Sequence, residues 1–303
     1  MKIAILGDGA MGCLFSAYLS RKNEVILVGH QQEKSDILSK ALTIVEKEGE
    51  SVFHVKATFD ASSLGKMDLV ILFVKSMISE TVLEANKNLL GEHTYVLTFQ
   101  NGCGHEEVIS KFVHKDRIII GTTQHNASVL SLGKVNHGGG GHSVIGLVAG
   151  DSSSLEPLAE NFTSCGLETE ASSEVKRAIW AKLCNNTSVS VMTAILQCPM
   201  EYLAQNAYAW ALTESLARET LSVAKVDGYE FDQEDMIQGL HTLVKQARNG
   251  FTSISTDIHE GRKTEVDKIS GFVVSEAKRL GVSVPQQAFV VDLVHALEGK
   301  ARV

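Results

Sequence analysis

The chain has 303 residues, 44% hydrophobic and 21% charged, which describes an ordinary soluble globular protein with room for about two domains. Its net charge of −8, from 28 basic and 36 acidic residues, disfavours nucleic acid as a partner. No apolar run reaches the roughly 18 residues of a membrane span, and the first run is too short for a cleavable signal, so no membrane association is expected.

The chain opens with a strand, a glycine-rich turn and a helix. Lys2–Leu6 is an apolar run typical of a buried parallel strand, and apolar residues at helical spacing follow the turn. This order is the one that a dinucleotide-binding βαβ unit requires, with the first glycine for the turn, the second for close approach of a pyrophosphate and the third for packing. The predicted cofactor-binding residues of this turn are Gly7, Asp8, Gly9, Ala10, Met11 and Gly12.

A second strand, Glu24–Val28, is followed by residues that bear on the choice of cofactor. An acid at the end of this strand usually binds the adenosine ribose hydroxyls and repels a 2′-phosphate. Here no acid occurs before Glu33, and His30, Gln31 and Lys34 could together hold a phosphate. The sequence therefore predicts NADPH rather than NADH, although each of these residues taken singly could belong to a solvated turn.

Further strands are expected along the first half of the chain. Lys75 follows one apolar run and Asn101 follows the next, at the carboxyl ends where doubly wound sheets bind ligands. An exposed lysine and a common Asn-Gly turn are the alternatives. Gly138–Gly141 is interpreted as a hairpin loop without chemistry. The predicted strands are Asp68–Val74, Thr94–Phe99, Arg117–Thr122 and Ser143–Val148, together with Ala41–Glu46 and Val52–Lys56 as a hairpin or two short strands.

From about Ser172 the pattern becomes helical. We therefore predict an α/β Rossmann-type dinucleotide-binding domain over residues 1–170 and an all-α domain over residues 171–303. The expected helices are Val175–Leu196, Tyr208–Val226, one capped by Asp232 that runs to about Arg248, Thr264–Leu280 and Gln286–Leu297.

Polar residues on two of these helices could carry chemistry. Lys182, Asn186 and Ser190 are spaced i, i+4, i+8 and should share one face, which is costly to bury unless it meets a polar ligand. A solvent-facing stripe is the alternative. Thr264 could cap the later helix with Glu265 in its first turn, where the helix dipole alone would explain an acid.

Several blocks together resemble one family along essentially the whole chain. They are G-x-G-A-x-G, D-L-V-x-x-x-V-K, Q-N-G, W-x-K-L-x-x-N and S-x-x-x-D-x-x-x-G-R-x-T-E-x-D, and they are similar to those of the ketopantoate reductase (2-dehydropantoate 2-reductase) family. The resemblance implies a 6-phosphogluconate dehydrogenase-like arrangement, in which a Rossmann domain binds NADPH and a helical domain closes over the substrate.

The resemblance also implies roles for individual residues. Lys182 matches the catalytic lysine and Glu265 the substrate-side glutamate. Asn101 and Asn186 match the two asparagines of the site, and Ser253 matches the serine that binds the substrate carboxylate. Lys75 matches a lysine near cofactor and substrate.

Two positions depart from the family pattern. Ser190 stands where a second asparagine usually holds the substrate, and His30 replaces a basic residue after the second strand. The implied reaction is NADPH-dependent reduction of 2-dehydropantoate to (R)-pantoate, in pantothenate and coenzyme A biosynthesis. The alternative is a sister NAD(P)-dependent 2-oxo acid reductase or D-2-hydroxyacid dehydrogenase, such as a D-mandelate-type enzyme. A non-catalytic nicotinamide sensor would need neither Lys182 nor Glu265.

Location and assembly are less constrained. Five scattered cysteines without C-x-x-C spacing favour reduced thiols and a cytoplasmic protein over disulfides or a zinc site. The sequence does not fix the oligomeric state, and a homodimer is one candidate. The expected partner is a small 2-oxo acid.

Overall fold

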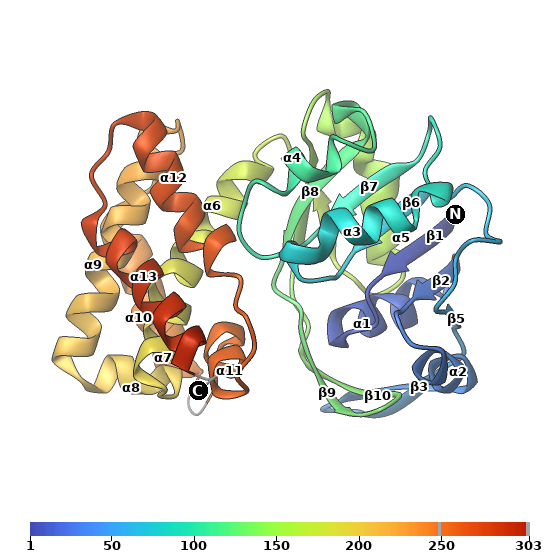
Figure 1. Cartoon of the computed structure of the whole chain (residues 1–303), viewed down its shortest axis with the longest axis horizontal. Coiled ribbons are helices and arrows are strands. Elements are labelled where there is room, and N and C mark those ends of the chain that lie inside the picture. The colour runs from blue at the N-terminus through green and yellow to red at the C-terminus, as the bar shows by residue number, and fades with distance from the viewer. Residues whose placement is uncertain (248–249, 301–303) are drawn as a thin grey trace. The chain divides into compact units, whose positions relative to one another are not determined.

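The computed structural model describes residues 1–247 and 250–300 of the chain. Contacts divide the chain into two compact units (Figure 1). The α/β unit comprises Met1–Gln100 and His105–Ala178, and the helical unit comprises Asn101–Gly104 and the chain from Ile179 onward. The short segment Asn101–Gly104 thus belongs with helices that follow it much later in the sequence.

The α/β unit is built on a mostly parallel sheet. Its strands lie in the order β12-β11-β8-β7-β6-β1-β2-β5, and only β11 runs antiparallel to its neighbour β8. Strands β1, β2 and β6 are buried along nearly their whole length, as expected of strands covered on both faces. The bounds are β1 (Lys2–Leu6), β2 (Glu24–Val28), β5 (Lys56–Thr58), β6 (Leu69–Leu72), β7 (Tyr95–Thr98), β8 (Ile118–Thr123), β11 (Ser143–Leu147) and β12 (Thr169–Ala171).

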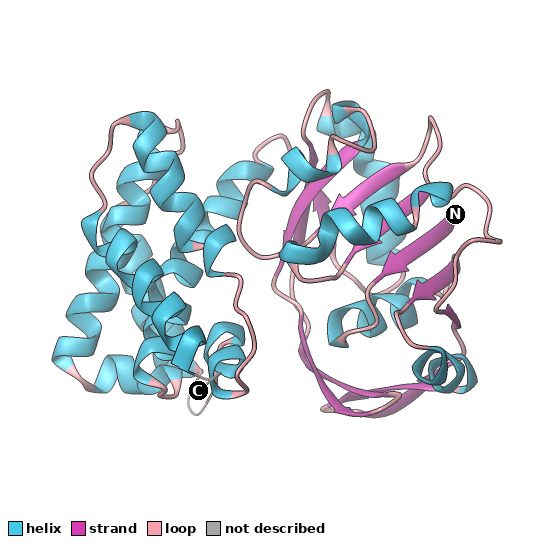
Figure 2. Cartoon of the chain, in the orientation of Figure 1, coloured by secondary structure: helices cyan, strands magenta, loops and turns pink. Residues whose placement is uncertain are grey.

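The strand order places the glycine turn at the centre of this sheet. Strand β1 has β2 on one side and β6 on the other, both parallel to it, so the order in which strands are added changes side at β1. In open α/β sheets ligands bind at such a point, outside the carboxyl ends of the strands. Helices pack against the sheet (Figure 2), namely α1 (Ala10–Leu19), α2 (Gln32–Lys40), α3 (Ser79–Ala85), α4 (His105–Ile109) and α5 (Glu156–Ser164).

A second, four-stranded sheet has the order β4-β3-β10-β9. Its strands are β3 (Leu42–Glu46), β4 (Gly49–Phe53), β9 (Asn126–Ser131) and β10 (Lys134–Gly139). Strands β3 and β4 form the predicted hairpin, but the expected strand Val52–Lys56 is divided between β4 and β5. The predicted hairpin around Gly138–Gly141 is wrong, because β10 pairs with β9 and β3 while β11 pairs with β8 in the large sheet.

A chain of buried polar groups joins α1 to the small sheet. The Tyr18 hydroxyl donates to Glu46 Oε1 at 2.5 Å, and His137 Nδ1 lies 2.8 Å from the same oxygen. His137 Nε2 in turn lies 3.1 Å from His125 Nδ1. Burial lowers the pKa of His125 to about 4, so this imidazole is neutral at physiological pH.

The helical unit contains no described strand. Its elements are α6 (Val175–Asn185), a π-helical segment (Asn186–Ser190), α7 (Val191–Leu196), α8 (Met200–Gln205), α9 (Ala207–Val226), α10 (Gln233–Gln246), α11 (Ser253–His259), α12 (Ser270–Leu280) and α13 (Pro285–Lys300). They enclose an apolar core to which α6, the π segment and α7 contribute Leu183, Val189 and Met192, respectively. No helix within residues 1–247 and 250–300 is long and apolar enough to cross a membrane.

The helices depart from prediction in four places. The expected helix Val175–Leu196 is continuous but contains the π segment, and neither α8 nor α11 was foreseen. The prediction of a helix from Thr264 is wrong: Val266–Lys268 forms a 3₁₀ turn and α12 begins at Ser270. Asp232 caps α10 as predicted, accepting from the Asp235 N–H at 3.0 Å. The predicted end of that helix at Arg248 lies outside the described residues.

The buried His125 makes stability depend on pH. Its folded pKa lies below the unfolded value of about 6.5, so the unfolded chain binds an extra proton between roughly pH 6.5 and 4. We expect the free energy of unfolding to fall as pH drops through this window, by on the order of 2–3 kcal/mol from this group. In urea titrations, His125→Gln should flatten the dependence and His114→Gln, at a 95% exposed side chain, should not. An unchanged slope in His125→Gln would contradict the assignment.

Candidate active site

The glycine turn leaves open space above the start of α1. Gly7 has a φ of +117°, and a Cβ added at Gly12 would lie only 1.8 Å from the Gly7 carbonyl oxygen. Both glycines are therefore required by the backbone itself. A Cβ added at Gly9, the residue before α1, would meet nothing within 4 Å, and no side chain caps the helix. Free N–H groups beside open space are what a pyrophosphate needs, so these residues fit a dinucleotide.

An acid missing from the end of β2 is supplied by the turn after β1. Asp8 is buried, and its Oδ1 lies 3.1 Å from Lys34 Nζ and 3.5 Å from His30 Nδ1. Its Oδ2 is buried without a hydrogen-bond partner, against Gly29. The sequence could not reveal this arrangement, because Asp8 and His30 follow different strands that become neighbours only in the sheet.

Lys75 lies at the same edge of the sheet, since β6 runs parallel to β1. It is half-buried and precedes a 3₁₀ turn, Ser76–Ile78. The neighbouring strand end is held by Gln100, whose Nε2 donates to the Val74 carbonyl at 2.6 Å and to Ser79 Oγ at 2.8 Å. The carboxyl ends of β6 and β7 are thereby tied together.

The loop that carries Asn101 is anchored in the helical unit. The Cys103 N–H donates to the Lys268 carbonyl at 3.0 Å, and Lys268 Nζ donates to the Gly104 carbonyl at 3.1 Å. Gly102 has a φ of +90°, and a Cβ there would lie 2.0 Å from the Lys268 carbonyl oxygen. The Lys268 N–H donates to the Glu265 carbonyl at 3.0 Å. One turn therefore connects Glu265 with the loop of Asn101.

The π segment carries two of the predicted site residues and is held by side chains from other helices. A π turn pairs N–H groups with carbonyls five residues back and often occurs at functional sites. Here the Thr187 carbonyl accepts from Gln287 Nε2 at 3.4 Å. The Ser190 carbonyl accepts from Thr193 Oγ1 at 3.0 Å and from Thr252 Oγ1 at 3.3 Å. These bonds fix where Asn186 and Ser190 can lie.

Lys182 precedes this segment on α6 and has an unusual environment. The residue keeps intermediate exposure, but its ammonium group is withdrawn from water. This desolvation lowers the pKa of Lys182 from 10.5 to about 8. Asn186 lies one helical turn after Lys182 and Ser190 two turns after it. The Ser190 hydroxyl donates to Asn186 Oδ1 at 3.4 Å, so the structure brings Asn186 and Ser190 together.

Ser253 is exposed and is the first residue of α11. The residue before it, Thr252, caps α11 and also bonds the Ser190 carbonyl, so α11 is tied to the π segment. Neither Thr252 nor Gln287 was singled out in the sequence. A threonine directly before a helical serine is a capping signal that could have identified the former.

Glu265 is half-buried, and its neighbour Thr264 belongs to a network of hydrogen bonds with the last helix, α13. The N–H and hydroxyl of Thr264 both donate to Glu298 Oε1, each at 2.7 Å. His295 bridges Glu298 Oε2 at 3.1 Å and Asp267 Oδ1 at 2.9 Å. The Thr264 hydroxyl also accepts from the Val266 N–H at 3.2 Å, so Thr264 bonds the start of the 3₁₀ turn Val266–Lys268 rather than capping the predicted α-helix.

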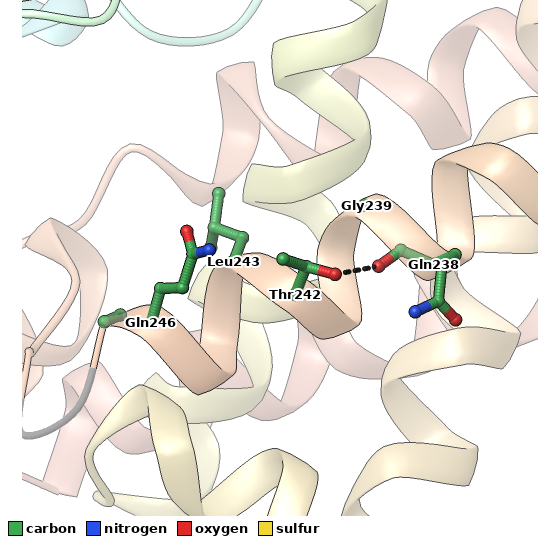
Figure 3. Close-up of a pocket in the computed structure, with 6 residues that line it drawn as sticks. Gln238, Gly239, Thr242, Leu243 and Gln246 are labelled. Atoms are coloured by element: carbon green, nitrogen blue, oxygen red, sulfur yellow. Dashed lines mark hydrogen bonds between the residues drawn. The ribbon is translucent and has the colours of Figure 1, made fainter.

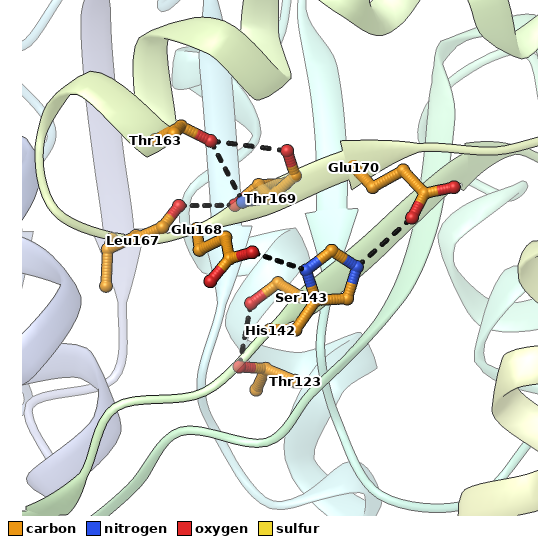
Figure 4. A network of polar contacts seen from close by, with 8 residues as sticks. All are labelled: Thr123, His142, Ser143, Thr163, Leu167, Glu168, Thr169 and Glu170. Carbon is orange, nitrogen blue, oxygen red and sulfur yellow. Dashed lines mark hydrogen bonds and ion pairs between the residues drawn. The ribbon is translucent and has the colours of Figure 1, made fainter.

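Two other places on the molecule, a hollow and a cluster of charged side chains, contain none of the predicted site residues. A hollow along α10 is lined by neutral side chains including Gln238, Thr242 and Leu243 (Figure 3). At the edge of the large sheet, His142 lies 3.6 Å from Glu168 and 3.2 Å from Glu170 (Figure 4). Among the described residues, no group of three or more histidines, cysteines and acids could hold a metal ion.

Comparison with known proteins shows the family. Residues 3–150 match the family described as Ketopantoate reductase PanE/ApbA, and residues 174–298 match its C-terminal counterpart. The chain belongs to the ketopantoate reductase family. It is 32% identical to a 2-dehydropantoate 2-reductase of Lactococcus lactis over 98% of both chains. Its identity to that of Pyrococcus abyssi is 33%, over 99% of this chain and 100% of the relative.

Solved structures agree with this placement and confirm the predicted fold class. A D-mandelate dehydrogenase with NADH and anilino(oxo)acetate superposes with a TM-score of 0.93 at 30% identity, covering 100% of both chains. The 2-dehydropantoate 2-reductase from Geobacter metallireducens superposes with a TM-score of 0.92 at 25% identity, covering 98% of this chain and 99% of that one.

The two glycines at the start of α1 should respond differently to an added methyl group. Gly12→Ala forces a clash with the Gly7 carbonyl, so we expect a loss of several degrees in Tm or no folded protein. Gly9→Ala should leave Tm nearly unchanged but weaken nicotinamide dinucleotide binding by roughly tenfold or more, because the methyl group occupies the phosphate space. Thermal denaturation and fluorescence titration measure both. Equal binding by Gly9→Ala and the unmodified protein would refute the phosphate site.

Proposed function

We propose that this protein uses NADPH to reduce 2-dehydropantoate to (R)-pantoate, a step of pantothenate and coenzyme A biosynthesis. The observation that carries the proposal is a desolvated lysine, Lys182, on the helix that also presents Asn186, in a chain of the ketopantoate reductase family. A lysine with a lowered pKa is a suitable proton donor for a reaction near neutral pH.

Reduction of a 2-oxo acid requires a hydride at C2 and a proton on the carbonyl oxygen. NADPH supplies the hydride when bound, and the residues that fit its phosphates are those of the turn Gly7–Gly12, with Lys75 at the same sheet edge. The Lys182 ammonium donates the proton as the alkoxide develops. With a pKa of about 8 it is mostly protonated at neutral pH, yet it releases a proton more readily than an ordinary lysine.

The other site residues orient the substrate. Asn101 and Asn186 present amides to the carbonyl, and the Ser253 hydroxyl donates to the carboxylate. Glu265 faces the substrate from the turn that also anchors the Asn101 loop. Preorganised donors of this kind stabilise developing charge without reorganisation during the reaction.

Steady-state kinetics with NADPH and a panel of 2-oxo acids tests the proposal. Turnover of 2-dehydropantoate supports it, and absence of turnover with every 2-oxo acid and both nicotinamide cofactors would refute it. The second candidate, a D-2-hydroxyacid dehydrogenase, is favoured by the D-mandelate dehydrogenase fold match at a TM-score of 0.93. That candidate predicts faster turnover of aromatic 2-oxo acids than of 2-dehydropantoate.

The cysteines and the net charge bear on the location and the partners that we propose for this enzyme. All five cysteines lie in the described part of the chain and form no disulfide there, which suits a reducing, cytoplasmic compartment. The charge of −8 keeps nucleic acid an unsuitable partner. The candidate assembly is a homodimer, which light scattering would establish or exclude.

Removal of the proton donor should reduce catalysis without weakening cofactor binding. We expect Lys182→Ala to lower kcat by roughly two to four orders of magnitude while the Kd for NADPH changes little. In the unmodified enzyme, the rate of reduction should fall as pH rises through about 8, because the ammonium loses its proton. That inflection should vanish from the residual activity of the variant. Unchanged turnover would mean that Lys182 is only part of a polar helix face.

Ser190 should weaken discrimination between substrates. Its hydroxyl is shorter than an asparagine amide, and it is already bonded to Asn186 at 3.4 Å. The adjacent Thr187 cannot substitute, since its hydroxyl donates to the Cys184 carbonyl at 3.2 Å and contacts Thr220 at 2.8 Å. We expect a small ratio of kcat/KM for 2-dehydropantoate over 2-oxoisovalerate, which lacks the 4-hydroxyl, and a larger ratio in Ser190→Asn. Strong selectivity unaffected by Ser190→Asn would contradict this role.

A further inference from the structure

Four residues meet where β1 and β2 end. Asp8 follows the first glycine of the turn after β1, Gly29 and His30 follow β2, and Lys34 lies in α2; we call them the Asp8 cluster. The two strands are parallel neighbours in register, with Leu6 opposite Val28, so their carboxyl ends lie at one edge. In dinucleotide-binding sheets this edge receives the adenosine ribose.

The carboxylate of Asp8 is almost fully enclosed, with 8% of its side chain exposed. Its Oδ1 has Lys34 Nζ at 3.1 Å and the His30 ring at 3.5 Å, whereas Oδ2 has no hydrogen-bond partner. Gly29 makes room for it, because a Cβ there would lie 2.5 Å from Oδ2. Because Oδ2 is closed off from solvent, a ligand at this edge meets the charge of the carboxylate and not a free hydrogen-bond acceptor at Oδ2.

The Asp8 cluster contains both an acid and a cation, which other dinucleotide-binding sheets use separately to bind the adenosine ribose. An acid at this position accepts hydrogen bonds from ribose hydroxyls, and a cation accommodates a 2′-phosphate. Resting on the cofactor class of the proposed function, we propose that Asp8 is a specificity-determining residue. Its negative charge offsets Lys34 and His30, so the protein binds a 2′-hydroxyl dinucleotide nearly as well as the 2′-phosphorylated one.

The distances support this balance. A phosphate oxygen bonded to Lys34 Nζ would lie about 2.8 Å from it. Since Nζ is 3.1 Å from Asp8 Oδ1, that phosphate oxygen cannot be farther than about 6 Å from the carboxylate. Like charges this close repel appreciably at the edge of a protein, and the repulsion cancels part of the attraction to Lys34. Removal of the carboxylate charge alone should therefore favour the phosphorylated cofactor.

The test compares binding of two adenosine fragments to the full-length protein by isothermal titration calorimetry. Adenosine 2′,5′-bisphosphate carries the 2′-phosphate and adenosine 5′-monophosphate carries the hydroxyl. We expect Kd values for the unmodified protein within about tenfold of each other, and a shift toward the bisphosphate on the order of tenfold in Asp8→Asn. The ratio of kcat/KM for NADPH over NADH should rise in parallel.

Two further variants make the result specific. Lys34→Met should shift the preference in the opposite direction, toward the hydroxyl fragment. Asp36→Asn removes an exposed acid of the same helix, one bonded to Gln32 at 2.5 Å, and should change nothing. Circular dichroism establishes folding, and if Asp8→Asn does not fold, the ratio of the two Kd values for the unmodified protein decides the question.

The outcomes separate this inference from the proposed function. Fragments that bind with a ratio unmoved by Asp8→Asn or Lys34→Met would overturn the role of the cluster and leave the reductase intact. A preference of the unmodified protein for the bisphosphate by a thousandfold or more would also overturn it. If the unmodified protein bound neither fragment nor NADPH, both the inference and the proposed function would fail.

Discussion

The proposed chemistry of the helical unit depends on the withdrawal of one ammonium group, that of Lys182, from water. Desolvation lowers the pKa of Lys182 to about 8, and it costs free energy that the packing of the surrounding helices must offset. Leu183, Val189 and Met192 of the same continuous helix lie in the apolar core. Packing of ordinary hydrophobic residues thus positions the lysine on which the proposed reaction depends.

The π segment extends this constraint to the residues proposed to bind the substrate. Gln287 and Thr252 bond its carbonyls, and Thr252 also caps the helix that begins with Ser253. The 3₁₀ turn after Glu265 similarly carries Lys268, which anchors the Asn101 loop. Each proposed substrate contact therefore has a named neighbour that sets its position, and a change at that neighbour would act through geometry rather than through lost chemistry.

In the α/β unit, the proposed choice of cofactor rests on charge rather than on packing. The glycine turn satisfies only backbone requirements and leaves space for a phosphate. In our proposal, selectivity between cofactors depends on a few charges at the ends of β1 and β2, where Asp8 lies 3.1 Å from Lys34. Residues far apart in sequence decide this balance, so counting acids and bases along the strand that ends at Val28 gives an incomplete answer.

The sequence by itself determined the elements whose cause is local. Strands Lys2–Leu6 and Glu24–Val28 agree with the structure residue for residue because continuous apolar runs specify buried parallel strands. Short-range sequence patterns likewise specify three other features. These are the glycine turn, the change from strands to helices near Ser172, and the spacing of Lys182 with Asn186. The motifs were sufficient to indicate the family.

Only the tertiary structure decided what depends on contacts between distant segments. The carbonyls of the π segment are bonded by Thr252, the cap of α11, and by Gln287 of α13. No pattern in the sequence of the segment itself predicts these partners. Thr264 bonds Glu298 instead of starting a helix, and Gly138–Gly141 connects two sheets instead of turning within one. Asp8 reaches the end of β2 because β1 and β2 are adjacent. Such pairings are set by the burial of whole elements, which is a property of the assembled core and not of any one stretch of sequence.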